Sequence, residues 1–446
     1  MPSHGFSFSP AQLSNIAELI VDHARKLGAS ACETDVSEGF GQSVTVRKGE
    51  TDTIEYNRDK GVGVTVYVGQ KRGHASTSDF SRPALEAAVE AALQIARFTA
   101  EDPCAGLAEE ALLAREFPDL DLFHPWNPSV EEALQLATRC EQAAFDASPA
   151  ISNSEGASVS SQQSHFVSAN SLGFNAGYST SRHSISCSVI AGEGDQMQRD
   201  DWYDSRRDAA DLDAAESIGA RAARRAEARM GARRIPTCEV PVLFEAPLAT
   251  SLLGNFVHAA SGGALYRKAS FLLDGLGRQL FAPHVQIVER PHLPKAFGSA
   301  PFDGDGVATR DRTVVADGVL QGYFLSCYSA RKLGMQTTAN AGGSHTLQVS
   351  HGPRSFEEML ARLDRGLLVT ELLGQGVNYV TGDYSRGAAG FWVENGQIQY
   401  PVEEITIAGN LTEMFANIVE IGADVWDRGA KHTGSMLIER MKIAGE

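Results

Sequence analysis

Histidine is the residue type in this sequence best suited to holding a catalytic metal, and the chain contains 12 of them. A zinc site needs three or four imidazole, thiolate or carboxylate ligands that converge on one point, and short motifs usually supply two of them. No H-E-x-x-H, H-x-H or H-x-x-E-H motif occurs. The pairs His345 and His351, and His284 and His292, lie in glycine-rich and proline-containing stretches, which indicates loop histidines and not ligand pairs.

Motifs for other chemistries are also missing from the sequence. There is no G-x-x-x-x-G-K-[ST] phosphate loop and no G-x-S-x-G nucleophile turn. Asp303-Gly-Asp305-Gly has the start of a calcium loop, but Val307 and Val314 stand where oxygen ligands are required, so a turn is predicted. The six cysteines show no C-x-x-C spacing, and we interpret them as free thiols in a reducing compartment.

Charge argues against nucleic acid and anionic lipid as partners, because the net charge is -17. One basic cluster lies near the end of a predicted helix, where cations interact favourably with the helix dipole, and we interpret it as a solvated face. Its members are Arg221, Arg224, Arg225, Arg229, Arg233 and Arg234. The sequence also lacks an apolar stretch of membrane-spanning length and the pattern of a signal peptide, so a cytoplasmic protein that does not enter the membrane is expected.

The elements that must position any site follow from periodicity and turn residues. Residues 1–237 are predicted to form an α+β domain with antiparallel sheets and flanking helices. Its expected parts are helices at 10–28, 82–100, 128–146 and 208–230, a hairpin at Lys48-Gly49, and a strand meander over 151–203. Residues 231–236 break this pattern and predict a domain boundary.

Residues 238–446 are predicted to form a mainly-β domain, barrel-like or a sandwich. A strand begins near Val240, and a helix follows from Pro247 to about Arg267. Asp317-Gly318 and Asn395-Gly396 each lie between alternating apolar residues, which predicts two hairpins. The complete chain is therefore expected to be α+β.

One segment of this second half carries a family resemblance. Residues 252–274, LLGNFVHAASGGALYRKASFLLD, resemble the TldD/PmbA family of metallopeptidases. The resemblance continues through residues 301–307 and 328–334, and is most specific in residues 381–396, TGDYSRGAAGFWVENG. It ends with residues 404–411 and 441–445, and is looser in the N-terminal half.

The TldD branch of that family has a His-Glu-x-x-x-His helix, in which two histidines bind zinc and the glutamate acts as base, and a cysteine near the C-terminus completes the site. On this pattern His258 matches the first histidine, whereas Ala259 stands at the glutamate, Gly263 at the second histidine and Thr433 at the cysteine. One ligand of three survives, and a methyl group replaces the base. The chain alone is therefore predicted to bind no metal and to be inactive as a peptidase.

The resemblance implies a peptidase assembled from one TldD-like and one PmbA-like chain, with zinc in the TldD-like partner. Its substrates would be unfolded peptides, since the family has been linked to a microcin precursor and to an antitoxin. His258, Tyr384, Ser385 and Arg386 would contact that substrate. His258 is alternatively a hydrogen-bonded wall residue, and Tyr384 and Arg386 alternatively cap a tight turn.

A second function is a stand-alone, homodimeric protein that binds a peptide or a partner without chemistry, in line with an old family label, modulation of DNA gyrase. A third is hydrolysis by a serine or threonine nucleophile, for which no Ser-His constellation can be assigned.

Overall fold

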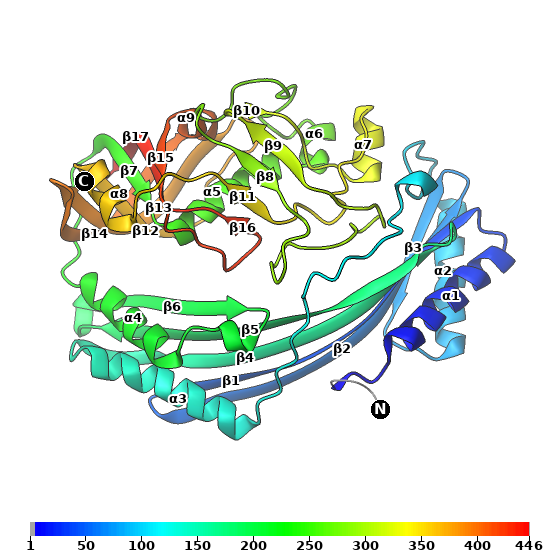
Figure 1. Ribbon diagram of the computed structural model, residues 1–446, viewed down its shortest axis with the longest axis horizontal. Coiled ribbons are helices and arrows are strands. Elements are labelled where there is room, and N and C mark those ends of the chain that lie inside the picture. The colour runs from blue at the N-terminus through cyan, green and yellow to red at the C-terminus, as the bar shows by residue number, and fades with distance from the viewer. Residues whose placement is uncertain (1–4, 446) are drawn as a thin grey trace.

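The computed structural model describes residues 5–445 of the chain. The N-terminal part contains one sheet and four α-helices (Figure 1). Its strands are β1 (Ala31–Arg47), β2 (Glu50–Val68), β3 (Lys71–Thr77), β4 (Ile151–Asn170), β5 (Asn175–Ala191) and β6 (Gln198–Arg206). Its helices are α1 (Pro10–Lys26), α2 (Arg82–Phe98), α3 (Val130–Ala147) and α4 (Ala215–Ala228).

Local sequence explains where these helices begin. The Ser9 hydroxyl accepts a hydrogen bond from the backbone N–H of Gln12, and the Gln12 side-chain oxygen accepts one from the backbone N–H of Ser9. Pro10 occupies the first turn. Ser129 and Glu132 form the same reciprocal cap on α3. The helix predicted over 208–230 begins later, at Ala215, because residues 209–211 form a separate 3-10 turn.

The N-terminal sheet is antiparallel throughout, with the order β3-β2-β1-β4-β5-β6. Side chains alternate between its faces, and the apolar positions of β1, such as Val36 and Val44, lie on the face covered by helices. Helices α1 and α2 pack at one end of that face, and α3 and α4 pack at the other. The opposite, concave face curves beneath the C-terminal half (Figure 1).

The C-terminal half contains two sheets. Its strands are β7 (Cys238–Phe244), β8 (Ile287–Glu289), β9 (Arg312–Ala316), β10 (Val319–Leu320), β11 (Leu347–Val349), β12 (Gly366–Leu373), β13 (Asp383–Glu394), β14 (Gln397–Asn410), β15 (Ile418–Ile421), β16 (Lys431–His432) and β17 (Met436–Ala444). Its helices are α5 (Ala246–Ala259), α6 (Gly262–Tyr266), α7 (Cys327–Leu333), α8 (Phe356–Leu363) and α9 (Leu411–Ala416).

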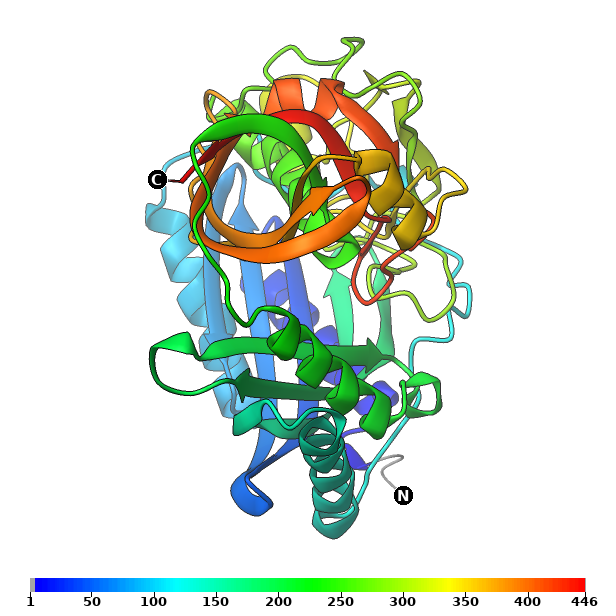
Figure 2. The same ribbon diagram turned by 90° about the vertical axis from the view of Figure 1, so that its left-hand side faces the viewer.

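Five of these strands close into a barrel, seen nearly end-on in Figure 2. The order β14-β13-β12-β7-β17 returns to its start because β14 pairs with β17, for example Ile407 with Ile443. Val242 and Phe244 of β7 face the interior and pack with α5, whereas Leu243 faces outward to the residues of α8. A second sheet has the order β10-β9-β8-β11-β16.

The predicted α+β class with a barrel-like second half is confirmed. Both predicted hairpin turns form, with positive φ at Asp317, Gly318, Asn395 and Gly396. The boundary between residues 237 and 238 stays a prediction. In the part of the chain that the structure describes, no helix is both long and apolar enough to span a bilayer.

Candidate functional site

His258 lies on the last turn of α5, with an exposed side chain. Its imidazole stacks on the ring of Tyr379, with centroids 4.0 Å apart. The hydroxyl of Tyr379 donates to Asn255 Oδ1 at 3.0 Å, one turn earlier on the same helix. A zinc-binding histidine is usually oriented by a hydrogen bond from its second ring nitrogen, whereas His258 is oriented by an aromatic face.

The helix expected to continue to Arg267 is interrupted, so that prediction was wrong. Helix α5 ends at Ala259, Ser261 caps the short α6, and Gly262 donates its backbone N–H to Phe324 O at 2.8 Å. The cause is a bridge between Ser261 and Phe324, which turns the chain out of the helical path. The predicted ligand positions 258 and 263 therefore lie on two different helices.

Two other positions of the degenerate pattern, Ala259 and Thr433, are buried. Ala259 is fully buried in the apolar core. Thr433 is also fully buried, and its carbonyl accepts from Trp426 N at 2.9 Å. Strand β16, directly before Thr433, passes beside α5. The side chain of Lys431 on this strand reaches Gly254 of the helix, where an added Cβ would lie 4.0 Å from Lys431 Cε. The tertiary structure thus places the segment of Thr433 next to the helix that carries His258.

These residues do not fit a tetrahedral zinc. The four positions offer an imidazole, a methyl group, a glycine without a side chain and a hydroxyl, and zinc is bound by imidazole, thiolate and carboxylate. Within residues 5–445, no three His, Cys, Asp or Glu side chains gather as a metal-binding group.

Tyr384 and Arg386 alternate with Ser385 along β13 and therefore share a face of that strand. Tyr384 is buried, and burial raises the pKa of its hydroxyl to about 12, although the Arg386 guanidinium acts in the opposite direction. Burial likewise raises the pKa of Tyr379, again opposed by Arg386. Ser385 is exposed and points to the other face.

A polar cluster therefore forms beside the end of α5, from His258, Asn255, Tyr379, Tyr384 and Arg386. Among the described residues, the Tyr384 hydroxyl, the Arg386 Nε and the Asn255 amide nitrogen have no hydrogen-bond partner. Three of the four predicted substrate-contacting residues join this cluster, and Ser385 does not.

The tight turn before β13 is held by other side chains. Thr381 Oγ1 donates to Asp383 Oδ2 at 2.6 Å, and the Asn410 amide donates to Thr381 O at 3.0 Å. Gly382 supplies the positive φ of 84° that the turn requires. Tyr384 and Arg386 are thus not needed to cap this turn.

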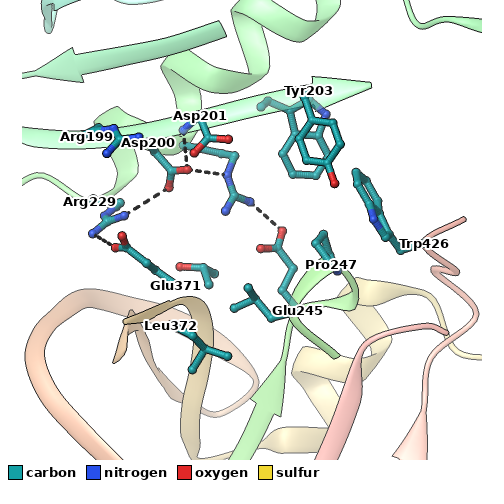
Figure 3. Close-up of a pocket in the computed structure, with 14 residues that line it drawn as sticks. Arg199, Asp200, Asp201, Tyr203, Arg229, Glu245, Pro247, Glu371, Leu372 and Trp426 are labelled. Atoms are coloured by element: carbon teal, nitrogen blue, oxygen red, sulfur yellow. Dashed lines mark hydrogen bonds and ion pairs between the residues drawn. The ribbon is translucent and has the colours of Figure 1, made fainter. Parts of the chain in front are cut away.

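Sequence reasoning missed a second charged site, at the edge of the N-terminal sheet (Figure 3). Arg225 of α4 bridges Asp200 Oδ1 at 3.1 Å and Glu245 Oε1 at 2.7 Å, and so joins the two halves of the chain. Arg229 pairs with Asp200 and Glu371. A cavity of about 410 Å³ lies beside these ion pairs.

The solvated-face interpretation of the arginine cluster is correct for the exposed Arg224 and wrong for Arg225 and Arg229. Their side chains are only 18% and 13% exposed, because acidic side chains of other elements face them. A run of arginines on a helix carries no local signal of which carboxylates of other elements will face it, such as Glu371 for Arg229.

Comparison with known proteins gives consistent matches along the chain. Residues 32–96 match the PmbA/TldA metallopeptidase domain 1, residues 123–230 its central domain, and residues 237–445 its C-terminal domain. Metalloprotease PmbA of Escherichia coli O157:H7 is 49% identical over 418 residues, which cover 94% of this chain and 93% of that protein.

Solved structures share the fold. A proposed modulator of DNA gyrase from Bacteroides thetaiotaomicron matches with a TM-score of 0.92 and 27% identity, covering 97% of this chain and 98% of that one. TldE from Thermococcus kodakarensis matches with a TM-score of 0.82 and 20% identity, covering 96% and 100%. At 20% identity the likeness concerns the fold alone.

Proposed function

Because this chain belongs to the PmbA/TldD family of metallopeptidases, we propose that it is the subunit of a two-chain peptidase that does not bind the catalytic zinc. The observation that carries this proposal is the donor set around His258. The one matching imidazole, on the last turn of α5, is followed by a buried alanine and, after a break in the helix, by a glycine. A lone imidazole holds a divalent ion weakly, and the position of the water-activating glutamate is occupied by Ala259.

In this proposal a TldD-like chain supplies the zinc, and the present chain supplies walls that hold the substrate. The substrates are unfolded peptides, such as a microcin precursor or an antitoxin, in the cytoplasm. The concave sheet face supports this role, because cavities of about 310 and 410 Å³ open between it and the C-terminal half. His258, Tyr384, Ser385 and Arg386 are proposed to contact the peptide, with Tyr384 and Arg386 acting as hydrogen-bond donors.

The test measures zinc content and peptide cleavage for the purified chain, for a TldD-like chain, and for the mixture. We expect far less than one zinc per molecule in the isolated chain, no cleavage by it, and activity in the mixture. One tightly held zinc per isolated chain, or robust cleavage without the partner, would contradict the proposal.

A second candidate is a stand-alone, homodimeric peptide-binding or regulatory protein. The likeness to the proposed gyrase modulator favours it. Co-purification from native cells separates the two candidates, since a stoichiometric TldD-like chain supports the peptidase subunit. A homodimer that is consistently free of that chain supports the second function.

A further inference from the structure

A cavity of about 410 Å³ lies on the concave sheet face, and it shares no lining residue with the charged site of Figure 3. The N-terminal sheet forms most of its wall, and Arg207, which follows β6, and Phe297 of the C-terminal half form the rest. Gln162 and Ser164 of β4 and Thr180 and Arg182 of β5 face it because alternate residues share one face of a strand. The wall is therefore rich in hydrogen-bonding side chains.

Two guanidinium groups lie close to the ring of Phe297 in this cavity. Arg182 lies 4.8 Å and Arg207 5.1 Å from the ring centroid. Arg207 is only 8% exposed, and its terminal nitrogens donate to the carbonyls of Ser181 at 3.0 Å and Phe297 at 3.1 Å. Its Nε has no hydrogen-bond partner among the described residues.

Within residues 5–445, no carboxylate forms an ion pair with Arg182 or Arg207, in contrast to Arg225, which pairs with two. Burial and the nearby positive charge of Arg182 lower the pKa of Arg207 to about 10. A nearly buried cation without a counter-charge is costly, and a bound anion removes that cost.

We propose that this cavity binds a carboxylate group of the peptide substrate, an inference that rests on the proposed peptide-handling function. The Nε of Arg182 donates a hydrogen bond to Ser205 Oγ at 3.0 Å. Its two terminal nitrogens are then available for a bidentate contact with a carboxylate. Ser164 and Thr180 add hydroxyl groups at the cavity wall. Asp59 is the one acid among the described lining residues, and it is exposed.

The test measures binding of fluorescent, unstructured peptides to the isolated full-length chain by anisotropy. Matched peptides differ in one acidic side chain against its amide, and in a free against an amidated C-terminus. We expect carboxylate-bearing peptides to bind more tightly, and Arg182→Gln to raise their Kd about tenfold while leaving fully amidated peptides unchanged. If Arg182→Gln abolishes the difference in Kd between the acidic and amide side chains, a side-chain carboxylate binds. If it abolishes the difference between the free and amidated C-termini, the C-terminal carboxylate binds.

Two further variants serve as controls. Arg224→Gln removes an exposed arginine of α4 outside the cavity and should leave the Kd unchanged. Asp59→Asn removes a competing negative charge and should tighten binding of the acidic peptides. Thermal unfolding establishes that each variant is folded.

Equal affinity for acidic and amidated peptides, or an unchanged Kd in folded Arg182→Gln, would overturn the inference. Binding by the isolated chain needs neither zinc nor a second subunit. If the isolated chain binds carboxylates but the mixture shows no peptidase activity, the subunit assignment alone is refuted. If the mixture is active but the isolated chain shows no preference for carboxylates, this site alone is refuted.

Discussion

The imidazole of His258 rests on the ring of Tyr379, with centroids 4.0 Å apart and planes inclined by 36°. Tyr379 in turn is tied to α5 through Asn255. In this arrangement the one surviving residue of a zinc-binding pattern is part of an aromatic contact, and its ring orientation does not depend on an ion.

This contact predicts that the free energy of unfolding depends on an aromatic ring at position 258 more than on the ring nitrogens of His258. His258→Phe should stay within about 0.5 kcal/mol of the wild type, whereas His258→Ala should lose about 1 kcal/mol, because an aromatic pair contributes that order of free energy. Urea unfolding of both variants measures this. A loss in His258→Phe as large as in His258→Ala would contradict the role of stacking.

Restoring donors should create metal affinity. We expect Gly263→His combined with Thr433→Cys to bind zinc more tightly than the wild type, since His258 would then be joined by an imidazole and a thiolate. The nearest atoms to a Cβ added at Gly263 belong to the flexible Arg267 guanidinium, at 3.4 Å. Competition with a zinc-sensitive dye gives the affinity, and Gly263→Ala is the matched control. Unchanged affinity in the folded double variant would refute the positional match.

The ion pairs between the two halves should contribute to stability. Arg225→Met leaves Asp200 and Glu245 with less positive charge nearby, and we expect a loss of about 2 kcal/mol in the free energy of unfolding. Arg224→Met, one position earlier and exposed, should change little. Denaturant titration of both variants provides the comparison, and equal losses would show that the bridge contributes nothing specific.

Asp303 predicts a pH dependence of stability. Burial, followed by the negative charge of Asp305, raises the pKa of Asp303 from 3.8 to about 7, although backbone N–H groups oppose this. A carboxyl group with a higher pKa in the folded than in the unfolded chain binds more protons when folded. Its stabilising contribution is therefore complete below pH 3.8 and disappears as the pH rises through about 7.

The free energy of unfolding, measured from about pH 4 to pH 8, should thus fall with pH more steeply in the wild type than in Asp303→Asn. Asp305→Asn provides the control, because removing the like charge should shift the fall to lower pH. Parallel curves for the wild type and Asp303→Asn would show that Asp303 titrates normally.

The sequence by itself determined the features that depend on residue identity or on near neighbours. The missing ligands at 259, 263 and 433 are visible without coordinates, since alanine, glycine and threonine cannot supply them. The Asp317-Gly318 and Asn395-Gly396 turns were predictable because their positive φ is a local requirement.

Only the tertiary structure decided which distant residues meet. Closure of the barrel depends on β14 pairing with β17, and the break after Ala259 depends on Phe324. Arg225 and Arg182 look alike in the sequence, yet one faces two carboxylates and the other a neutral ring and a second arginine. Local patterns fix backbone preference and side-chain alternation, whereas the partner of a charge is set by the path of the chain between them.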